Sequence, residues 1–319
     1  MTALAPIVLF VYKRPAHTRR TLDALSKNPE AKSSCLHVFC DGPKSDTSEA
    51  DRQAIMDTRS IVRERQWCGE VHIHEIESNL GLAKSIRQGV TTILDNQERV
   101  IVLEDDIETA PGFLAYMNQA LELYAQEDRV MHIAAYLPLT SYHWLLPSSF
   151  FHRMMFCWGW ATWRRSWDYA RWDARQLTKE LTESPGGIYN FDVQGTFPLS
   201  EHLRANLEGR SSTWAVFWAA SIYLNRGLCL FPGITLVRNI GLDGSGENCD
   251  NSTEFEVNLS EVIKLKSIQL RESLIGRFYM RSFFRYGNDS GIFRRLRITS
   301  GRLKHRLFLK MNHKAYANQ

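Results

Sequence analysis

The chain has 319 residues, 44% of them hydrophobic, which is enough to bury a full core and long for one average domain without requiring two. The net charge of +4 is too small to indicate nucleic-acid binding by itself, and no nucleic-acid recognition motif accompanies it. Six dispersed cysteines, with no C-x-x-C pair and no zinc-like spacing, predict buried and reduced thiols.

The sequence also gives no indication of a targeting segment, which sets the expected location. No segment approaches the roughly 18 consecutive apolar residues of a membrane span. The apolar run at 5–11 has no basic region before it and no cleavage site after it, so it predicts a first strand and not a signal peptide. We therefore expect a cytoplasmic protein, with a peripheral position on the inner face of the membrane as the alternative.

Strand and helix patterns alternate along the first half of the chain. Apolar runs predict strands at 6–12, 36–40, 71–76, 100–103 and 129–134. Helical spacing and stop signals predict helices at 18–25, at 48–65, in a segment ending at Leu94, and at 111–126. This alternation is typical of βαβ units and predicts an α/β fold with a mostly parallel sheet.

The stretch 99–113 (RVIVLEDDIETAPGF) combines a buried strand with an acidic end. Glu104, Asp105 and Asp106 follow the apolar run where it would leave the sheet, and in open α/β sheets ligands gather at such carboxyl ends. Three adjacent acids repel one another unless a cation lies among them, and oxygen ligands suit Mg²⁺ or Mn²⁺. The alternative is an acidic first turn of the following helix.

Other predicted strands also end in polar residues. Arg14, Asp41 and Asn79 each follow one of the first three strands. Neither a G-x-x-x-x-G-K-[ST] nor a G-x-G-x-x-G motif follows any strand. These polar residues therefore suit a nucleotide that is bound without a P-loop.

The second half changes character, because five of the nine tryptophans lie between 158 and 172. Most of these indoles are expected in the core, yet an indole face can also stack on a sugar ring, which makes Trp158, Gly159 and Trp160 candidates for acceptor or sugar contacts. The apolar segment 213–226 predicts a buried helix that ends at Gly227, with strands at 228–231 and 235–237 after it. The glycine-rich, acidic loop that follows is either a ligand-contacting loop or a plain surface turn.

The C-terminal region is strongly basic. From Glu261 onward there are fourteen lysines and arginines against three acids, interleaved with aromatic residues. This composition indicates basic amphipathic segments on an anionic membrane surface, with a solvated helical appendage as the alternative. We expect a catalytic domain at 1–255, a basic and aromatic extension at 256–319, and no nucleic-acid partner.

Taken together, the motifs resemble GT-A-fold glycosyltransferases, specifically bacterial family-2-like sugar transferases similar to the N-acetylglucosaminyltransferase I family. The motifs occur in order between Pro6 and Cys249. They are Arg14-Pro15, Asp41-Gly42-Pro43, Asn79-Leu80-Gly81-Leu82, Leu103-Glu104-Asp105-Asp106, Cys157-Trp158-Gly159-Trp160-Ala161-Thr162-Trp163, Asn239-Ile240-Gly241 and Asp243-Gly244-Ser245-Gly246.

The resemblance implies a Rossmann-like GT-A sheet and a nucleotide-sugar donor, with a UDP-sugar expected. Arg14, Asp41, Asn79 and Lys84 would bind the donor, Asp105 would face its sugar or the waters of the metal, and Ser245 would cover its phosphates. Asp106, with Glu104, would hold Mn²⁺ or Mg²⁺ as the family's DXD equivalent.

The resemblance also implies an inverting displacement with a carboxylate base. Relatives often place an aspartate between or just before the tryptophans of the buried helix, whereas this chain has Ser212-Thr213-Trp214-Ala215-Val216-Phe217-Trp218 there. The predicted base is therefore Asp243, with Glu247 second and Asp168 or Asp173 after them.

These inferences predict a metal-dependent hexosyl- or N-acetylhexosaminyltransferase in surface polysaccharide assembly, acting on a glycan or a lipid-linked acceptor. A nucleotidyltransferase that makes an activated sugar is one alternative. It would normally carry a glycine-rich loop after the first strand, and Tyr12-Lys13-Arg14-Pro15 lacks the glycines. A non-catalytic glycan- or membrane-binding protein with a degenerate GT-A site is the other.

Overall fold

The first four strands of the main sheet lie parallel to one another in the computed structural model, which describes residues 3–244 and 265–287. They are β1 (Ile7–Val11), β2 (Cys35–Cys40), β3 (Glu70–Glu75) and β4 (Arg99–Glu104), in the order β3-β2-β1-β4. Helices α1 (Pro15–Ser26), α2 (Glu49–Arg63) and α3 (Leu82–Leu94) connect them. This half of the sheet consists of the predicted βαβ units.

The sheet continues with a strand of opposite direction. β8 (Trp160–Trp163) pairs antiparallel with both β4 and β6 (Val130–Ala134), then β9 (Leu228–Pro232) pairs parallel with β6, and β7 (Ser149–His152) closes the edge antiparallel to β9. Six of the eight strands therefore run in one direction. The predicted α/β class with a mostly parallel central sheet flanked by helices is confirmed.

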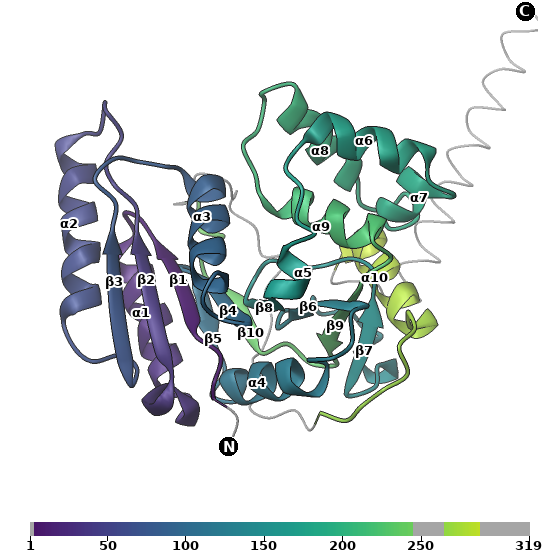
Figure 1. Ribbon diagram of the computed structural model, residues 1–319, viewed down its shortest axis with the longest axis horizontal. Helices are drawn as coiled ribbons and strands as arrows, with labels where there is room; N and C mark the ends of the chain where they lie inside the picture. The colour runs from purple at the N-terminus through teal and green to yellow at the C-terminus, as the bar shows by residue number, and fades with distance from the viewer. Residues whose placement is uncertain (1–2, 245–264, 288–319) are drawn as a thin grey trace, which may run out of the picture.

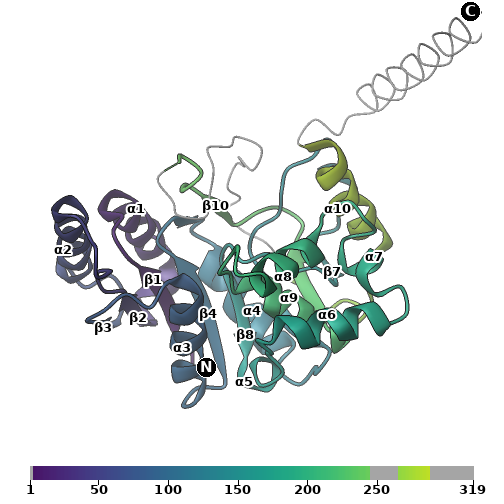
Figure 2. The same ribbon diagram turned by 90° about the horizontal axis from the view of Figure 1, so that it is seen from above.

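Two faces of the sheet carry separate hydrophobic cores. On one face, α1 and α2 pack on β1 and β2, burying side chains such as Leu25 and Val38. On the other, α3 packs on β1 and β4, with Gly89 against the ring of Phe10. Figure 2 shows α1 and α2 on one side of the strands and α3 on the opposite side.

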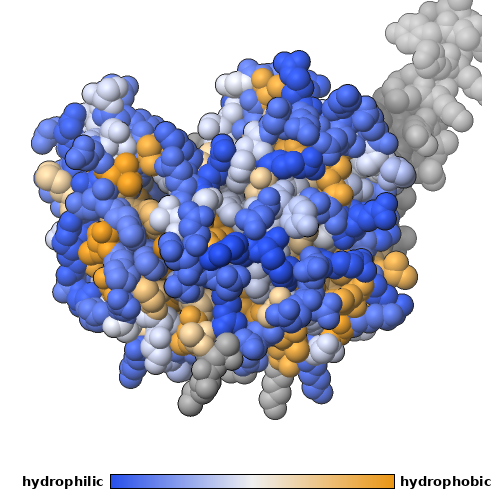
Figure 3. Space-filling view, in the orientation of Figure 1, coloured by the Kyte–Doolittle hydropathy of each residue, from blue (hydrophilic) through white to orange (hydrophobic). Residues whose placement is uncertain are grey.

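The remaining helices lie on the side of the second half of the sheet (Figure 1). They are α4 (Phe113–Leu123), α5 (Arg164–Trp167), α6 (Ala174–Glu183), α7 (Gly187–Phe191), α8 (Leu199–Leu207), α9 (Ala215–Leu224) and α10 (Leu274–Tyr286), with short 3₁₀ turns at Pro29–Ser33 and His143–Leu145. Among them, α6 and α8 pack on α9. The surface that faces the viewer in Figure 3 is mostly hydrophilic, as the polar outer faces of such helices predict.

A small second sheet lies beside the end of β4. β5 (Ile107–Thr109) directly follows the acidic residues, and β10 (Val237–Asn239) pairs with it antiparallel, Asn239 opposite Ile107. Neither β5 nor the pairing was predicted from the sequence. The pairing brings the glycine-rich loop to the acidic end of β4.

The aromatic segment after residue 155 is mainly core. Trp160 is fully buried and stacks on Trp214 and His132 at 5.2 and 5.5 Å between ring centroids. The Trp218 indole donates a hydrogen bond to Nδ1 of His132, and burial lowers the pKa of His132 to about 3. Part of this segment forms strand β8 at Trp160–Trp163, and aromatic residues and threonine favour strands.

Helix α10 falls within the expected extension at 256–319 and packs on the domain. Tyr279, Met280 and Phe283 are buried, and the Tyr279 hydroxyl donates a 2.7 Å hydrogen bond to the carbonyl of Pro138. A side chain at position 276 would collide with the ring of Phe150, so glycine there permits the close approach of α10 to β7. No helix within residues 3–244 and 265–287 is long and apolar enough to span a membrane.

Candidate active site

A cavity of about 130 Å³ lies at the carboxyl ends of β1, β2 and β4. The carboxyl ends of parallel strands meet at one edge of a sheet, so residues that are far apart in the sequence come together there. Six of the predicted site residues line this cavity: Arg14, Asp41, Asn79, Glu104, Asp105 and Asp106.

Asp41 organises one wall of the cavity. Its buried carboxylate accepts hydrogen bonds from the backbone N–H groups of Gly42, Leu80 and Gly81, at 2.9 to 3.0 Å, and from the side-chain amide of Asn79 at 3.1 Å. A Cβ at position 42 would come within 2.6 Å of the backbone at Ile76, which explains the glycine after Asp41. Asp41 therefore holds the 79–81 loop in place.

The 79–81 loop leads directly into α3, which places the amino terminus of this helix at the cavity. Gly81, in the left-handed region at φ +76°, is the residue before Leu82, where the helix begins. A helix amino terminus attracts anions, including phosphates, through its dipole and free N–H groups. Lys84, predicted to bind the donor, is exposed and does not line the cavity.

Arg14 lies between two carboxylates at the end of β4. Its Nη1 is 3.0 Å from Oδ2 of Asp106 and 3.4 Å from Oδ1 of Asp105. Burial by itself would lower the pKa of Arg14, but the Asp105 and Asp106 charges raise it overall. The guanidinium therefore stays charged and pairs with the acidic cluster.

Burial and mutual repulsion disfavour the charged forms of the acidic cluster, and Arg14 offsets this only in part. Burial, then the Asp106 charge, raises the pKa of Asp105 to about 7, while Arg14 opposes the shift. Burial, then the charges of Asp106 and Asp105, raises the pKa of Glu104 well above its ordinary value. If all three acids were ionised, the single Arg14 charge would leave two negative charges unbalanced, which a divalent cation would neutralise.

Several buried polar atoms at this cavity have no hydrogen-bond partner among the described residues. They are Nε and Nη2 of Arg14, Oγ of Ser85 and Oδ1 of Asp106. Unpaired buried polar groups cost about 1–3 kcal/mol each, so their concentration in one cavity indicates a polar ligand. Free donors on Arg14 and Ser85 suit phosphate oxygens, and the free oxygen of Asp106 suits a cation.

The carboxylates fit a metal that also uses substrate oxygens. Within the described ranges, the three acids do not bring three carboxylate oxygens within 4.8 Å of one another. Mg²⁺ commonly binds through one or two carboxylates together with substrate phosphates, so two protein ligands are sufficient. Asp106 and a neighbouring acid can therefore hold such an ion.

The loop after β10 lies against the acidic cluster. The Ile240 backbone N–H donates a 2.8 Å hydrogen bond to the carbonyl of Asp106. A side chain at position 241 would collide with Arg14 and Asp106, so only glycine allows this approach. The sequence left open whether this loop contacts a ligand or is a plain surface turn, and in the structure Gly241 lies against the Arg14–Asp106 pair.

Asp243, the predicted base, is half-exposed beside this cluster. Its Oδ2 is 3.1 Å from Nε2 of His17, a residue of α1 that the sequence analysis did not select. His17 Nε2 also lies 3.2 Å from the Ile240 carbonyl oxygen. The structure therefore supplies a partner for Asp243, and Asp243 acts on the charge of Arg14, but neither Asp243 nor His17 lines the cavity. The other loop residues, Ser245 and Glu247, lie outside the described residues.

The predicted acceptor contacts divide into buried and partly exposed residues. Trp160 has no exposed surface, and Gly159 is buried against Val237 and Phe113. The prediction that these two residues contact the acceptor or the sugar is therefore wrong for the structure. Large aromatic residues gain more by burial in the core. Trp158 is half-buried, edge-on to Tyr136 at 4.5 Å, and keeps exposed surface for a contact.

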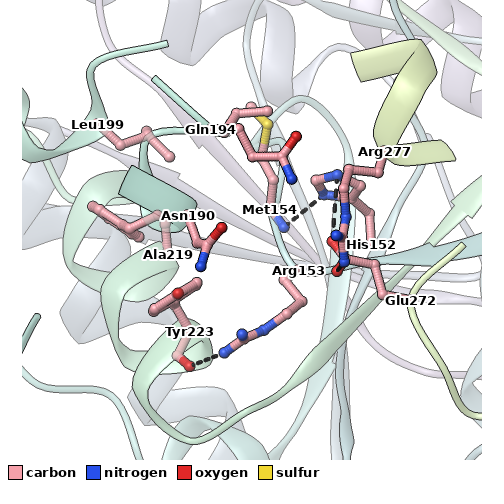
Figure 4. A pocket seen from close by; sticks show the side chains of 12 residues that line it. His152, Arg153, Met154, Asn190, Gln194, Leu199, Ala219, Tyr223, Glu272 and Arg277 are labelled. Atoms are coloured by element: carbon pink, nitrogen blue, oxygen red, sulfur yellow. Dashed lines mark hydrogen bonds and ion pairs between the residues drawn. The ribbon is translucent and has the colours of Figure 1, made fainter. Parts of the chain in front are cut away.

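A second cavity, of about 120 Å³, lies near β7, α7, α9 and α10 and contains none of the predicted site residues (Figure 4). Arg153 donates to the Tyr223 carbonyl at 2.6 Å and Arg277 pairs with Glu272, while Nε of Arg153 and Oε1 of Gln194 have no hydrogen-bond partner among the described residues. Burial lowers the pKa of His152 in this cavity to about 4. The cavity at β1, β2 and β4 is the stronger candidate for the active site, because the predicted residues from three strand ends line it.

Comparisons with known proteins find similarity to parts of solved structures and none at the level of the sequence. No protein-family model and no curated protein matches the sequence. Among solved structures, the chain is similar to a protein of Desulfovibrio desulfuricans G20 classed as a nucleotide-diphospho-sugar transferase (TM-score 0.31, 14% identity, covering 52% of this chain and 66% of that one). It is also similar to a cytidylyltransferase from Leptospira borgpetersenii serovar Hardjo-bovis (0.32, 12%, covering 51% and 62%) and to an active-site mutant of LgtC (0.31, 12%, covering 56% and 63%). The chain thus covers less than two thirds of each of these proteins.

Proposed function

We propose that this protein is a metal-dependent glycosyltransferase of the GT-A type, which moves a sugar from a nucleotide-sugar to a hydroxyl group of a glycan or lipid-linked acceptor. The observation that carries the proposal is the set of unpaired buried atoms at the cavity: donors on Arg14 and Ser85 beside an unpaired oxygen of Asp106. A diphosphate with an attached cation presents the matching acceptors and charge. A UDP-sugar is the expected donor.

Donor binding would use groups at three strand ends. The free nitrogens of Arg14 and the amino terminus of α3 favour the diphosphate, while the Asp41-held loop and Phe39 form the wall for the nucleoside. Asp106, with Asp105 or Glu104, would hold Mn²⁺ or Mg²⁺. When bound, such an ion stabilises the negative charge that gathers on a leaving nucleoside diphosphate.

The transfer itself needs a group that accepts a proton. In the proposed step, the acceptor oxygen forms a bond to the anomeric carbon, the bond from that carbon to the diphosphate breaks, and the hydroxyl proton moves to the Asp243 carboxylate. His17 contacts Asp243 and holds it beside the acidic cluster. Attack from the side opposite to the leaving group inverts the anomeric configuration.

Nucleotide binding and turnover test the proposal. Calorimetry with UDP, GDP and CMP in Mn²⁺ and in EDTA should show metal-dependent affinity, and a panel of nucleotide-sugars should release nucleoside diphosphate. Asp106→Asn should abolish turnover and the metal-dependent part of the affinity. Asp95→Asn is the matched control, because this exposed acid lies at the far end of α3.

Each outcome of this experiment separates the alternatives. A parallel incubation with a nucleoside triphosphate and a sugar phosphate tests for a nucleotidyltransferase, which would release pyrophosphate from them. Absence of metal-dependent nucleotide affinity would refute the proposed function and favour a non-catalytic binding protein.

A further inference from the structure

One face of the β2–β3 pair carries a thiol, three imidazoles and a carboxylate. The parallel register sets Cys35 opposite Glu70, His37 opposite His72, and Phe39 opposite His74. Alternate residues of a strand point to the same face, so these six side chains share one side of the sheet. The intervening residues of β2, such as Val38, face the core under α1 and α2.

This face is open where the cluster lies. α3 packs on the same side of the sheet, but over β1 and β4, and its contact with β2 is at Phe39. Figures 1 and 2 show β2 and β3 beside α3 with no helix in front of them. Cys35 and His37 are half-buried, and the His72 side chain is 44% exposed, so an ion can reach them from solvent.

The donor atoms lie close together. Sγ of Cys35 is 3.4 Å from Nε2 of His37, and one ligand atom each from Cys35, His37 and His72 lie within 4.8 Å of one another. The second ring nitrogen of His37, Nδ1, is 3.1 Å from Nε2 of His74. Glu70 Oε1 is 2.9 Å from Nε2 of His72.

Neutral imidazole and thiolate are the forms of these side chains that bind metals. Metal binding by Cys35 would therefore release the thiol proton to solvent.

We propose that Cys35, His37 and His72 bind one zinc ion, which fastens the edge strand β3 to β2. Thiolate sulfur and imidazole nitrogen are the ligands that Zn²⁺ prefers, whereas the oxygen-only cluster at β4 suits Mg²⁺ or Mn²⁺. His74 acts as the outer partner of His37 and orients its ring, as hydrogen-bonded partners of metal-binding histidines do. Glu70 or a water molecule takes the fourth position.

The zinc content of the full-length protein tests this site. After exposure to Zn²⁺ and gel filtration, elemental analysis should find one zinc per chain, and Co²⁺ should give the charge-transfer band of a thiolate ligand. Cys35→Ser and His72→Gln should each lose the bound zinc, and Cys35→Ser should lose the band. Cys157→Ser and His143→Gln are matched controls outside the cluster and should keep both.

Two further measurements separate a metal site from a merely structural cluster. His74→Ala should weaken zinc affinity by about 10–100-fold. Zinc should raise the melting temperature of the unsubstituted chain and leave that of Cys35→Ser unchanged. Absence of zinc from the unsubstituted protein after exposure to Zn²⁺, or zinc retained in both ligand variants, would overturn the proposal.

The zinc proposal stands or falls separately from the proposed function. Cys35, His37 and His72 do not line the cavity at β4. Asp106→Asn should therefore keep its zinc while losing metal-dependent nucleotide binding. A joint loss of both in Asp106→Asn would show that the zinc lies in the acidic cluster and would refute the site on β2 and β3.

Discussion

Replacing Asp41 by asparagine tests whether this residue builds the cavity wall or only contacts a ligand. The carboxylate accepts four hydrogen bonds, two at each oxygen. Asparagine keeps one acceptor oxygen, which can retain the N–H groups of Gly42 and Leu80. Its amide nitrogen would face two other donors, the Gly81 N–H and the Asn79 amide.

The expected cost follows from those two donors. The Gly81 N–H loses its acceptor, which costs about 1–3 kcal/mol for a buried group. The Asn79 amide either loses its acceptor as well or rotates and gives up its bond to the Gly42 carbonyl, which costs about 1 kcal/mol. The free energy of unfolding should therefore fall by about 2–4 kcal/mol, and the melting temperature by about 3–6 °C.

Urea unfolding and UDP calorimetry on Asp41→Asn give the two readouts. Both stability and nucleotide affinity should fall, because the 79–81 loop and the start of α3 lose their anchor. Asp95→Asn, the same chemical change at an exposed site, should stay within about 0.5 kcal/mol of the unsubstituted protein. Weakened nucleotide affinity with unchanged stability would refute the anchoring role and make Asp41 a ligand contact.

Three further predictions concern the acidic cluster and its loop. Gly241→Ala should cut turnover at least about tenfold and leave the fold intact by circular dichroism, because its methyl group displaces the Arg14–Asp106 pair; unchanged kinetics would place the loop elsewhere in solution. Asp243→Asn should lower the rate while donor affinity by calorimetry stays nearly unchanged, and a fully active variant would assign the base to another residue. The pKa of the Asp105 carboxyl is about 7 in the folded protein and about 4 in the unfolded chain. Protonation of Asp105 therefore stabilises the fold fully below about pH 4, and this stabilisation is lost as the pH rises through 7. Mn²⁺ binds the ionised form, so its effect on melting temperature should grow from pH 6 to pH 8, and a constant effect would contradict this linkage.

The main parts of the fold and of the candidate site could be predicted from short-range patterns. Apolar runs and their stop signals located the first four strands to within one or two residues. Because the carboxyl ends of parallel strands share one edge, Arg14, Asp41 and Asn79 could be placed with the acidic residues before any contact was known. This inference needed only the alternation of strands and helices.

Other features depend on contacts between distant residues, which local periodicity does not contain. β8 inserts between β4 and β6 in the opposite direction, and its aromatic residues indicated a core without indicating their strand partners. Burial of Trp160 likewise depends on Trp214 and His132, which other elements supply.

By itself, then, the sequence determined the α/β class, the strand ends and the chemistry gathered at them, since these follow from interactions between neighbours along the chain. Only the tertiary structure decided that Asp41 anchors a loop, that β10 brings Gly241 against Arg14, and that α10 joins the core. It also set His37 beside His72, which depends on the register of two strands joined by a whole helix. Pairing and register are determined by the packing of complete surfaces, so they become visible only when the chain is folded.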